Sequence, residues 1–162
     1  MGCVISQDEL IPRRAEWKRY GQRVVFASGV FDVLHPGHVR LLEQARSHGD
    51  ILVVGIESDE KSPGQNCTTT NTRAITPACE RAEIIASLAA VDFAVEFNPA
   101  SLPSFLAQLA PDVIIKGARP ASQPADQRNA ESTSTSSQLI HIPVEPGHST
   151  ARLIERIKNL NA

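Results

Sequence analysis

The sequence predicts an α/β fold in which five parallel strands form one sheet flanked by helices. Short apolar runs, typical of strands buried on both faces, alternate along the chain with longer segments of helical periodicity. Gly49 and Asp50 mark one junction, because a glycine after a helical segment ends the helix and lets the next strand begin. The length of 162 residues fits one domain of this class, and no internal repeat is visible.

The predicted elements follow one another in regular order. Residues 1–22 are expected to form a helical lead-in, in which Ser6 and Glu9 cap a helix that Pro12 kinks or restarts. Residues 23–160 are expected to form the main domain. Its strands are predicted at Arg23–Ser28, Ile51–Glu57, Phe93–Glu96, Val113–Lys116 and Leu139–Ile142. Its helices are predicted at Gly37–His48, Pro77–Ala89, Leu102–Leu109 and Ser149–Leu160.

Composition excludes several classes of protein. With 16 basic and 18 acidic residues the net charge is -2, which favours neither nucleic acid nor an acidic membrane as a partner. The apolar runs are too short to span a bilayer. Cys3, Cys67 and Cys79 lack metal or redox spacing and are expected to be free thiols in the cytoplasm. Residues 1–6 fit an N-myristoylation pattern, but this pattern matches often by chance, and we favour the helix cap.

The most informative segment is residues 29–38, which read GVFDVLHPGH between an expected strand and an expected helix. A helix N-terminus offers unpaired backbone N–H groups and a partial positive charge, so it attracts anions. Pro36 suits the first turn, and Gly37 lets a phosphate approach the backbone. His35 and His38 can each donate an imidazole N–H to phosphate oxygens, and protonation would strengthen those bonds. The segment predicts a triphosphate site.

Two further residues of this segment have expected roles. Phe31 is predicted to plug the core beneath the turn, and Asp32 to orient a histidine or another donor. The alternative is an ordinary capped turn with two surface histidines. The whole string, in its strand-to-helix context, favours the phosphate site.

Other segments are expected to reach the same cleft, because ligands of such sheets bind beyond the carboxyl ends of the strands. Ser28 ends one predicted strand and Lys116 ends another. Lys116 is either a solvated lysine or a group that neutralises phosphate, and we favour the second interpretation. Gly147 permits an unusual turn before Ser149 and Thr150. Ser149 alone reads as a helix cap, although the N–H groups beside it can bind phosphate.

Residues 29–38 resemble the HxGH signature of the nucleotidyltransferase superfamily that includes the cytidylyltransferases and their adenylyltransferase relatives. Within it, the chain is most similar to the bacterial heptose-phosphate adenylyltransferases, the nucleotidyl-transferring part of ADP-heptose synthase. The resemblance runs from about Arg23 to Ile157. It is carried further by RAITP at 73–77, ERAEI at 80–84, AVD at 90–92, PDVIIKG at 111–117 and IPVEPGHST at 142–150.

The resemblance implies a Rossmann-like fold of the HIGH-type nucleotidyltransferases and a definite activity. AMP would pass from ATP to a sugar phosphate, heptose-1-phosphate giving ADP-heptose for lipopolysaccharide precursors, with release of pyrophosphate. It implies that His35 and His38 stabilise the transition state and that the backbone of Gly29–Phe31 cradles the phosphates. It implies that Ser149 and Thr150 contact the β- and γ-phosphates. A Mg²⁺ ion is expected with ATP, with Asp32 as its candidate outer-shell or direct oxygen ligand, and a homodimer is expected.

Alternatives stay open at this point. CTP with a polyol or amino-alcohol phosphate is the second hypothesis, and a non-catalytic nucleotide-binding relative is the third. The segment Ala118-Arg119-Pro120, where acceptor or base contacts are expected, departs from the pattern of the resembling enzymes. Arg81 is expected to pair with glutamates on a helix surface or to contact another subunit. The polar segments 58–72 and 120–137 are expected to be loops.

Overall fold

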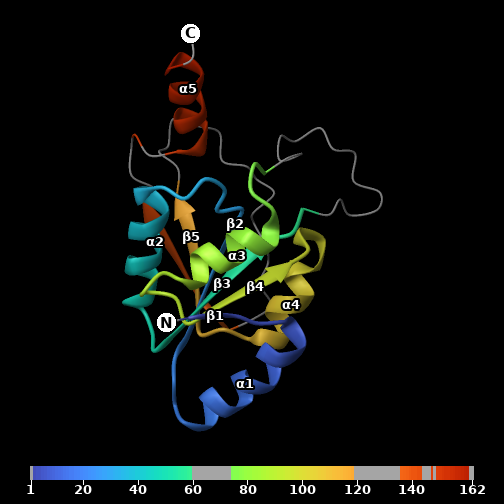
Figure 1. The fold of residues 1–162 in the computed structure, drawn as a ribbon. Helices are drawn as coiled ribbons and strands as arrows, with labels where there is room; N and C mark the ends of the chain where they lie inside the picture. Colours follow the sequence, from blue (N-terminus) through green and yellow to red (C-terminus); the bar gives the residue numbers. More distant parts are fainter. Residues whose placement is uncertain (1, 60–73, 119–135, 144–146, 148, 161–162) are drawn as a thin grey trace.

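The computed structural model describes residues 2–59, 74–118, 136–143, 147 and 149–160. Its six strands form one parallel sheet in the order β1-β4-β3-β2-β5-β6 (Figure 1). The strands are β1 (Cys3–Val4), β2 (Val24–Gly29), β3 (Ile51–Glu57), β4 (Phe93–Phe97), β5 (Val113–Ala118) and β6 (Gln138–Pro143). The helices are α1 (Gln7–Arg19), α2 (Pro36–Arg46), α3 (Ala78–Ala86), the 3-10 turn η1 (Pro99–Ser101), α4 (Leu102–Leu109) and α5 (Thr150–Leu160).

The sheet separates two apolar cores, as alternation along its strands requires. In β2, Val25 and Ala27 belong to the core that α2 and α3 cover, whereas Val24 and Phe26 belong to the core that α1 and α4 cover. Because both faces of the sheet are buried, the central strands are apolar throughout. This confirms the predicted α/β class.

Two sequence-based expectations need correction. The sheet has six strands rather than five, because β1 pairs with β4 and forms the edge of the sheet on that side. With two residues, both exposed, β1 carries no periodicity that a sequence pattern reveals. Pro12 does not restart α1, which runs unbroken with the predicted capping box at Ser6 and Glu9. Leu10 and Trp17 hold this helix in the second core, so packing compensates for the lost hydrogen bond.

The N-terminus is packed against the sheet edge. The amide of Cys3 donates to the carbonyl of Asp92 at 3.1 Å. A Cβ at Gly2 would lie 2.4 Å from the carbonyl oxygen of Val91, so only glycine fits there. The lead-in residues therefore belong to the same packed body as the rest of the sheet.

The strand order places a ligand-binding edge between β2 and β5. From β2 the chain proceeds to β3 and β4 on one side and then to β5 and β6 on the other. Ligands of such sheets bind where the order reverses, beyond the carboxyl ends of the strands. Helix α5 stands beyond this edge (Figure 1). Within the described part of the chain, no helix has the length and apolar character needed to cross a membrane.

Several predicted features lie outside the described residues. These are Cys67, Arg119, Pro120 and most of the predicted loops 58–72 and 120–137.

Candidate functional site

The loop that joins β2 to α2 has an unusual backbone. Phe31 has φ 51° and Val33 has φ 48°, and neither is a glycine. Left-handed conformations of this kind cost of order 1–3 kcal/mol each, so the surroundings must hold them. The Phe31 side chain lies in the core beneath the loop, as predicted. A Cβ at Gly29 would lie 3.2 Å from the Phe31 ring, which explains the need for a small residue at that position.

The carboxylate of Asp32 holds a distant segment of backbone. It accepts hydrogen bonds from the amides of Val33 at 3.0 Å, Ile75 at 2.8 Å and Thr76 at 3.1 Å. Burial acts to raise the pKa of Asp32, but these backbone bonds and one from the Thr76 side chain outweigh it, and the pKa lies below its ordinary value. Asp32 is therefore an ionised clamp between the β2–α2 loop and residues 75–76.

This geometry does not fit Asp32 as a direct Mg²⁺ ligand. Both carboxylate oxygens already accept backbone hydrogen bonds, and the residue is only 8% exposed. Among the described residues, no group of three or more histidine, cysteine or carboxylate side chains is arranged to hold a metal ion.

The signature histidines form a stacked pair at the N-terminus of α2. The ring centroids of His35 and His38 lie 3.7 Å apart with an interplanar angle of 22°. His35 is the N-cap, and no side chain caps the helix. Pro36 has no N–H, and the amides of His38 and Val39 donate to the His35 carbonyl at 2.9 and 3.4 Å. The amide of Gly37 is therefore the N–H of this turn that is left for an anion. Pro36 begins the helix as predicted, and Gly37 is buried at the next position. The alternative of a capped turn with two surface histidines does not hold, since His35 is buried and His38 is half-buried.

The surroundings of His38 favour its neutral ring in the free protein. Burial and, to a smaller extent, the neighbouring His35 lower the pKa of His38 to about 4, and Asp32 opposes both effects. Nδ1 of His38 is buried and has no hydrogen-bond partner among the described residues. A neutral imidazole carries one donor and one acceptor nitrogen, so His38 is set to hydrogen-bond a ligand without a full charge.

We expect acid to destabilise the protein through His38. Between pH 6.5 and about 4 the unfolded chain protonates this ring and the folded chain does not, so the free energy of unfolding falls as the pH falls. Allowing for the partial exposure of the ring, the change should be roughly 1–2 kcal/mol. Urea unfolding at pH 7 and pH 4.5 measures it. His38→Asn should show a smaller loss than the wild type, and equal losses in the two proteins would contradict the assignment.

The second predicted anion segment lies against the first. The Thr150 hydroxyl donates to the carbonyl oxygen of Asp32 at 2.8 Å, which ties the start of α5 to the β2–α2 loop. Ser149 acts as a helix cap, because its Oγ accepts from the amide of Arg152 at 3.3 Å. Gly147 has φ 97°, the left-handed conformation that its position was predicted to need. Two helix N-termini therefore meet at one edge of the sheet.

Lys116 and Ser28 are placed on neighbouring strands at this edge. Ala27 of β2 pairs with Ile115 of β5, so Ser28 and Lys116 each follow by one residue toward the carboxyl ends. Lys116 is half-buried and Ser28 is exposed. The strand order thus brings the β2–α2 loop, Lys116 and the start of α5 to the same edge.

Arg81 contradicts its predicted surface role, since it is 2% exposed. Its guanidinium donates to the carbonyls of Val30, Glu57 at 3.0 Å and Thr76 at 2.8 Å. It also forms an ion pair with Asp59 at 2.5 Å. One signal in the sequence pointed to this placement, because Arg81 lies four residues before an apolar isoleucine and therefore on the buried face of its helix.

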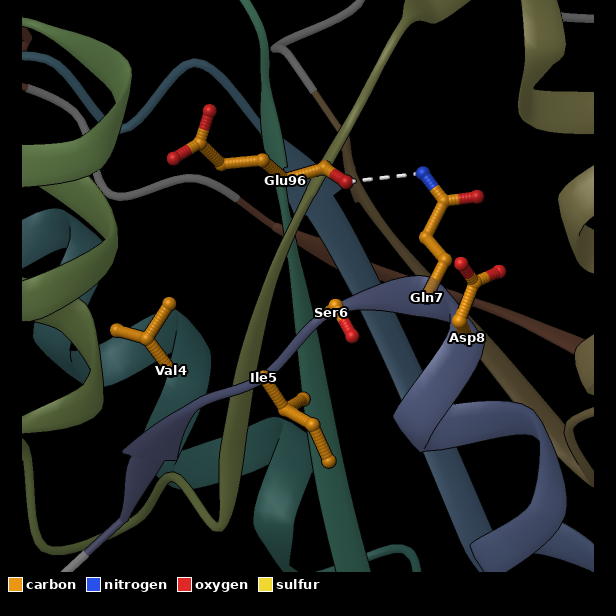
Figure 2. Close-up of a pocket in the computed structure, with 6 residues that line it drawn as sticks. All are labelled: Val4, Ile5, Ser6, Gln7, Asp8 and Glu96. Carbon is orange, nitrogen blue, oxygen red and sulfur yellow. Dashed lines mark hydrogen bonds between the residues drawn. The ribbon is translucent and has the colours of Figure 1, made fainter.

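Two openings lie away from the histidines. One of about 570 Å³ is lined by the start of α1 and by Glu96, whose carbonyl accepts from Nε2 of Gln7 at 3.0 Å (Figure 2). The carboxylates of Asp8 and Glu96 make this opening unsuitable for a phosphate. The other, of about 400 Å³, borders Asp59 and the start of α3.

Fold and site together define a class, the α/β proteins that bind a nucleotide at the carboxyl edge of a parallel sheet. Comparison with known sequences makes this specific, because the model of the Cytidylyltransferase-like family matches residues 26–159. The chain belongs to this family. The match confirms the resemblance drawn from the sequence and the predicted enzyme class, nucleotidyltransferase.

Curated relatives include proteins named "Bifunctional protein HldE". That of Koribacter versatilis (strain Ellin345) is 37% identical over 153 residues, which cover 94% of this chain and 31% of that protein. That of Acidiphilium cryptum (strain JF-5) is 36% identical over 157 residues, with 96% and 31% covered. The chain thus spans 31% of the length of both relatives.

Solved structures share the fold. The lipopolysaccharide core biosynthesis protein from Thermoplasma volcanium GSS1 superposes with a TM-score of 0.61 at 27% identity, covering 77% of this chain and 99% of that one. Pantothenate synthetase from Thermus thermophilus has a TM-score of 0.56 at 16% identity, covering 88% of this chain and 62% of that one, and shows likeness of fold alone.

Proposed function

We propose that this chain moves AMP from ATP to a sugar phosphate and releases pyrophosphate. Heptose-1-phosphate is the proposed acceptor, and ADP-heptose, a lipopolysaccharide precursor, is the proposed product. The observation that carries the proposal is the stacked pair of His35 and His38 at the uncapped start of α2. The similarity to the HldE relatives and to the lipopolysaccharide core biosynthesis protein supports this choice of acceptor and pathway.

The reaction needs little covalent chemistry from the protein. An oxygen of the sugar phosphate attacks the α-phosphorus of ATP, and the bond from that phosphorus to the β-phosphate oxygen breaks, so pyrophosphate carries away the electron pair. The attacking oxygen is already anionic, and no strong base is required. Positioning and neutralisation of charge therefore supply the rate enhancement. His35 and His38 would donate hydrogen bonds to oxygens whose charge grows in the transition state.

The remaining edge residues would hold the triphosphate. The backbone of Gly29–Phe31 and the N–H of Gly37 would approach its oxygens closely. Lys116 would supply positive charge, and the start of α5 at Ser149 and Thr150 would bind the β- and γ-phosphates. ATP would arrive as its Mg²⁺ complex. A homodimer in the cytoplasm is part of the same proposal.

A second candidate is transfer of CMP from CTP to a polyol or amino-alcohol phosphate. The name of the matching family favours it. A non-catalytic nucleotide-binding role is the third possibility, and the intact histidine pair argues against it.

Pyrophosphate release separates these functions. The purified chain is incubated with ATP or CTP, each combined with heptose-1-phosphate or glycerol-3-phosphate. We expect release with ATP and heptose-1-phosphate alone. A preference for CTP would replace the proposal with the second candidate. Nucleotide binding without release in any combination would favour the third. The double variant His35→Ala/His38→Ala serves as the control for contaminating activity.

A further inference from the structure

Arg81 joins three segments that meet beneath the site. Its guanidinium binds the carbonyls of Val30 in the β2–α2 loop, Glu57 at the end of β3 and Thr76 before α3. The Thr76 peptide is shared, because its N–H donates to the Asp32 carboxylate while its carbonyl accepts from Arg81. A closed circuit of contacts therefore surrounds the loop. Hydrogen bonds join Arg81 to Val30 and to Thr76, and Thr76 to Asp32, and the backbone joins Val30 to Asp32.

The loop needs such a circuit to keep its shape. The two left-handed residues, Phe31 and Val33, lie on either side of Asp32 and are unfavourable in isolation. The hydrogen bonds of the circuit hold the loop at Val30 and Asp32, next to these two left-handed residues. The loop leads directly into His35, so its conformation sets where the stacked rings lie relative to the helix N-terminus.

The positive charge of Arg81 is balanced mainly by one carboxylate, that of Asp59. Asp59 pairs with it at 2.5 Å and also accepts from the amide of Ala78, the first residue of α3, at 2.7 Å. Burial raises the pKa of the other nearby carboxyl group, Glu57, although Arg81 acts to lower it. Asp59 is therefore the principal counter-charge, and it fixes the guanidinium relative to α3.

We infer that Arg81, anchored by Asp59, is a positioning residue for nucleotidyl transfer: it holds the β2–α2 loop in the conformation that stacks His35 and His38 at the phosphate edge. This inference rests on the proposed function. Arg81 itself reaches no substrate, because its donors are engaged by protein carbonyls and a carboxylate.

The test compares two buried arginines. Arg81→Lys keeps the charge but cannot reach carbonyls on three segments at once. Arg14→Lys is the matched control. Arg14 also donates to a backbone carbonyl, that of Ala110, and forms an ion pair with Asp112. These contacts lie before β5, at the opposite edge of the sheet from the histidines. For both variants and the wild type, NMR titration gives the pKa of the His38 ring, and steady-state assays give kcat and KM for ATP. Circular dichroism verifies the fold.

We expect Arg81→Lys to release the stack. The pKa of His38 should rise from about 4 toward its ordinary value of 6.5. The kcat should fall about tenfold or more, while Arg14→Lys should stay within about twofold of the wild type at a temperature where both are folded. If Arg81→Lys does not fold, Asp59→Asn is used instead, because it removes the counter-charge and keeps the bonds from Arg81 to the carbonyls. It should raise the pKa of His38 and lower kcat, each by less than Arg81→Lys.

Two results decide the outcome. The inference is overturned if the pKa of His38 stays at the wild-type value in the folded Arg81 or Asp59 variant and kcat falls no further than in Arg14→Lys. If the wild type releases no pyrophosphate with any substrate pair, the proposed function fails instead. The NMR titration still decides whether Arg81 positions the histidines, because that measurement needs no substrate.

Discussion

Replacing either His35 or His38 with alanine is expected to lower kcat by about a hundredfold or more while the protein stays folded. Each ring is proposed to donate a hydrogen bond to oxygens that gain charge only as the α-phosphorus is attacked. Donors that act in this way contribute little to ground-state binding, so KM for ATP should change far less than kcat. Steady-state pyrophosphate release gives both constants.

The rings should behave as a unit. They are stacked at 3.7 Å, so removing one leaves the other without its neighbour. The kcat of the double variant is therefore expected to be about that of the slower single variant. If the two effects were independent, their fold-losses in kcat would multiply.

A matched control is His48→Ala. His48 follows the C-terminus of α2, at the opposite end of the helix from the stacked pair, and its amide donates to Ala45. This variant should retain wild-type kcat. Turnover like that of the wild type in either His35→Ala or His38→Ala would refute the roles proposed for these residues.

The fold was largely predictable because its strongest determinants are local. The buried strands are continuous apolar runs, and the helices between them show their own period, so β2 to β6 and α2 to α5 lie within a few residues of their predicted bounds. Strand β1 was not predicted, because a strand of two exposed residues shows no periodicity in the sequence. Its place is fixed by backbone pairing with β4, about ninety residues away in the sequence, which no local pattern encodes.

The site was predictable where composition determines it. The turn residues Pro36 and Gly37 predicted the start of α2, which the structure places at Pro36. Anion binding there stays a prediction. The surface role predicted for Arg81 was wrong, and the contacts of Asp32 with residues 75–76 were not predicted, because the partners include backbone atoms of distant segments. Main-chain partners carry no side-chain signal in the sequence, and Asp59, whose carboxylate pairs with Arg81, lies 22 residues away. The low pKa of His38 likewise depends on burial that only the folded chain creates.

The clamp formed by Asp32 predicts a second large effect. Asp32→Ala leaves the amides of Val33, Ile75 and Thr76 without their acceptor in a partly buried region. The expected loss in the free energy of unfolding is about 2–4 kcal/mol. Asp32→Asn keeps the size but presents an NH₂ group to backbone donors, so it should lose most of the same stability. Urea unfolding at pH 7 measures both.

The same variants separate a clamp from a metal ligand. A clamp that shapes the loop before His35 predicts that Asp32→Asn lowers kcat at saturating Mg²⁺ but leaves the half-saturating Mg²⁺ concentration unchanged. A ligand to the ion predicts the reverse, a raised Mg²⁺ requirement with near-normal stability. Asp112→Asn is the control, because Asp112 accepts from the amide of Val24 at the opposite edge. It should lose stability and keep its Mg²⁺ response and most of its kcat. A Mg²⁺ requirement raised about tenfold in Asp32→Asn alone would restore Asp32 as a ligand.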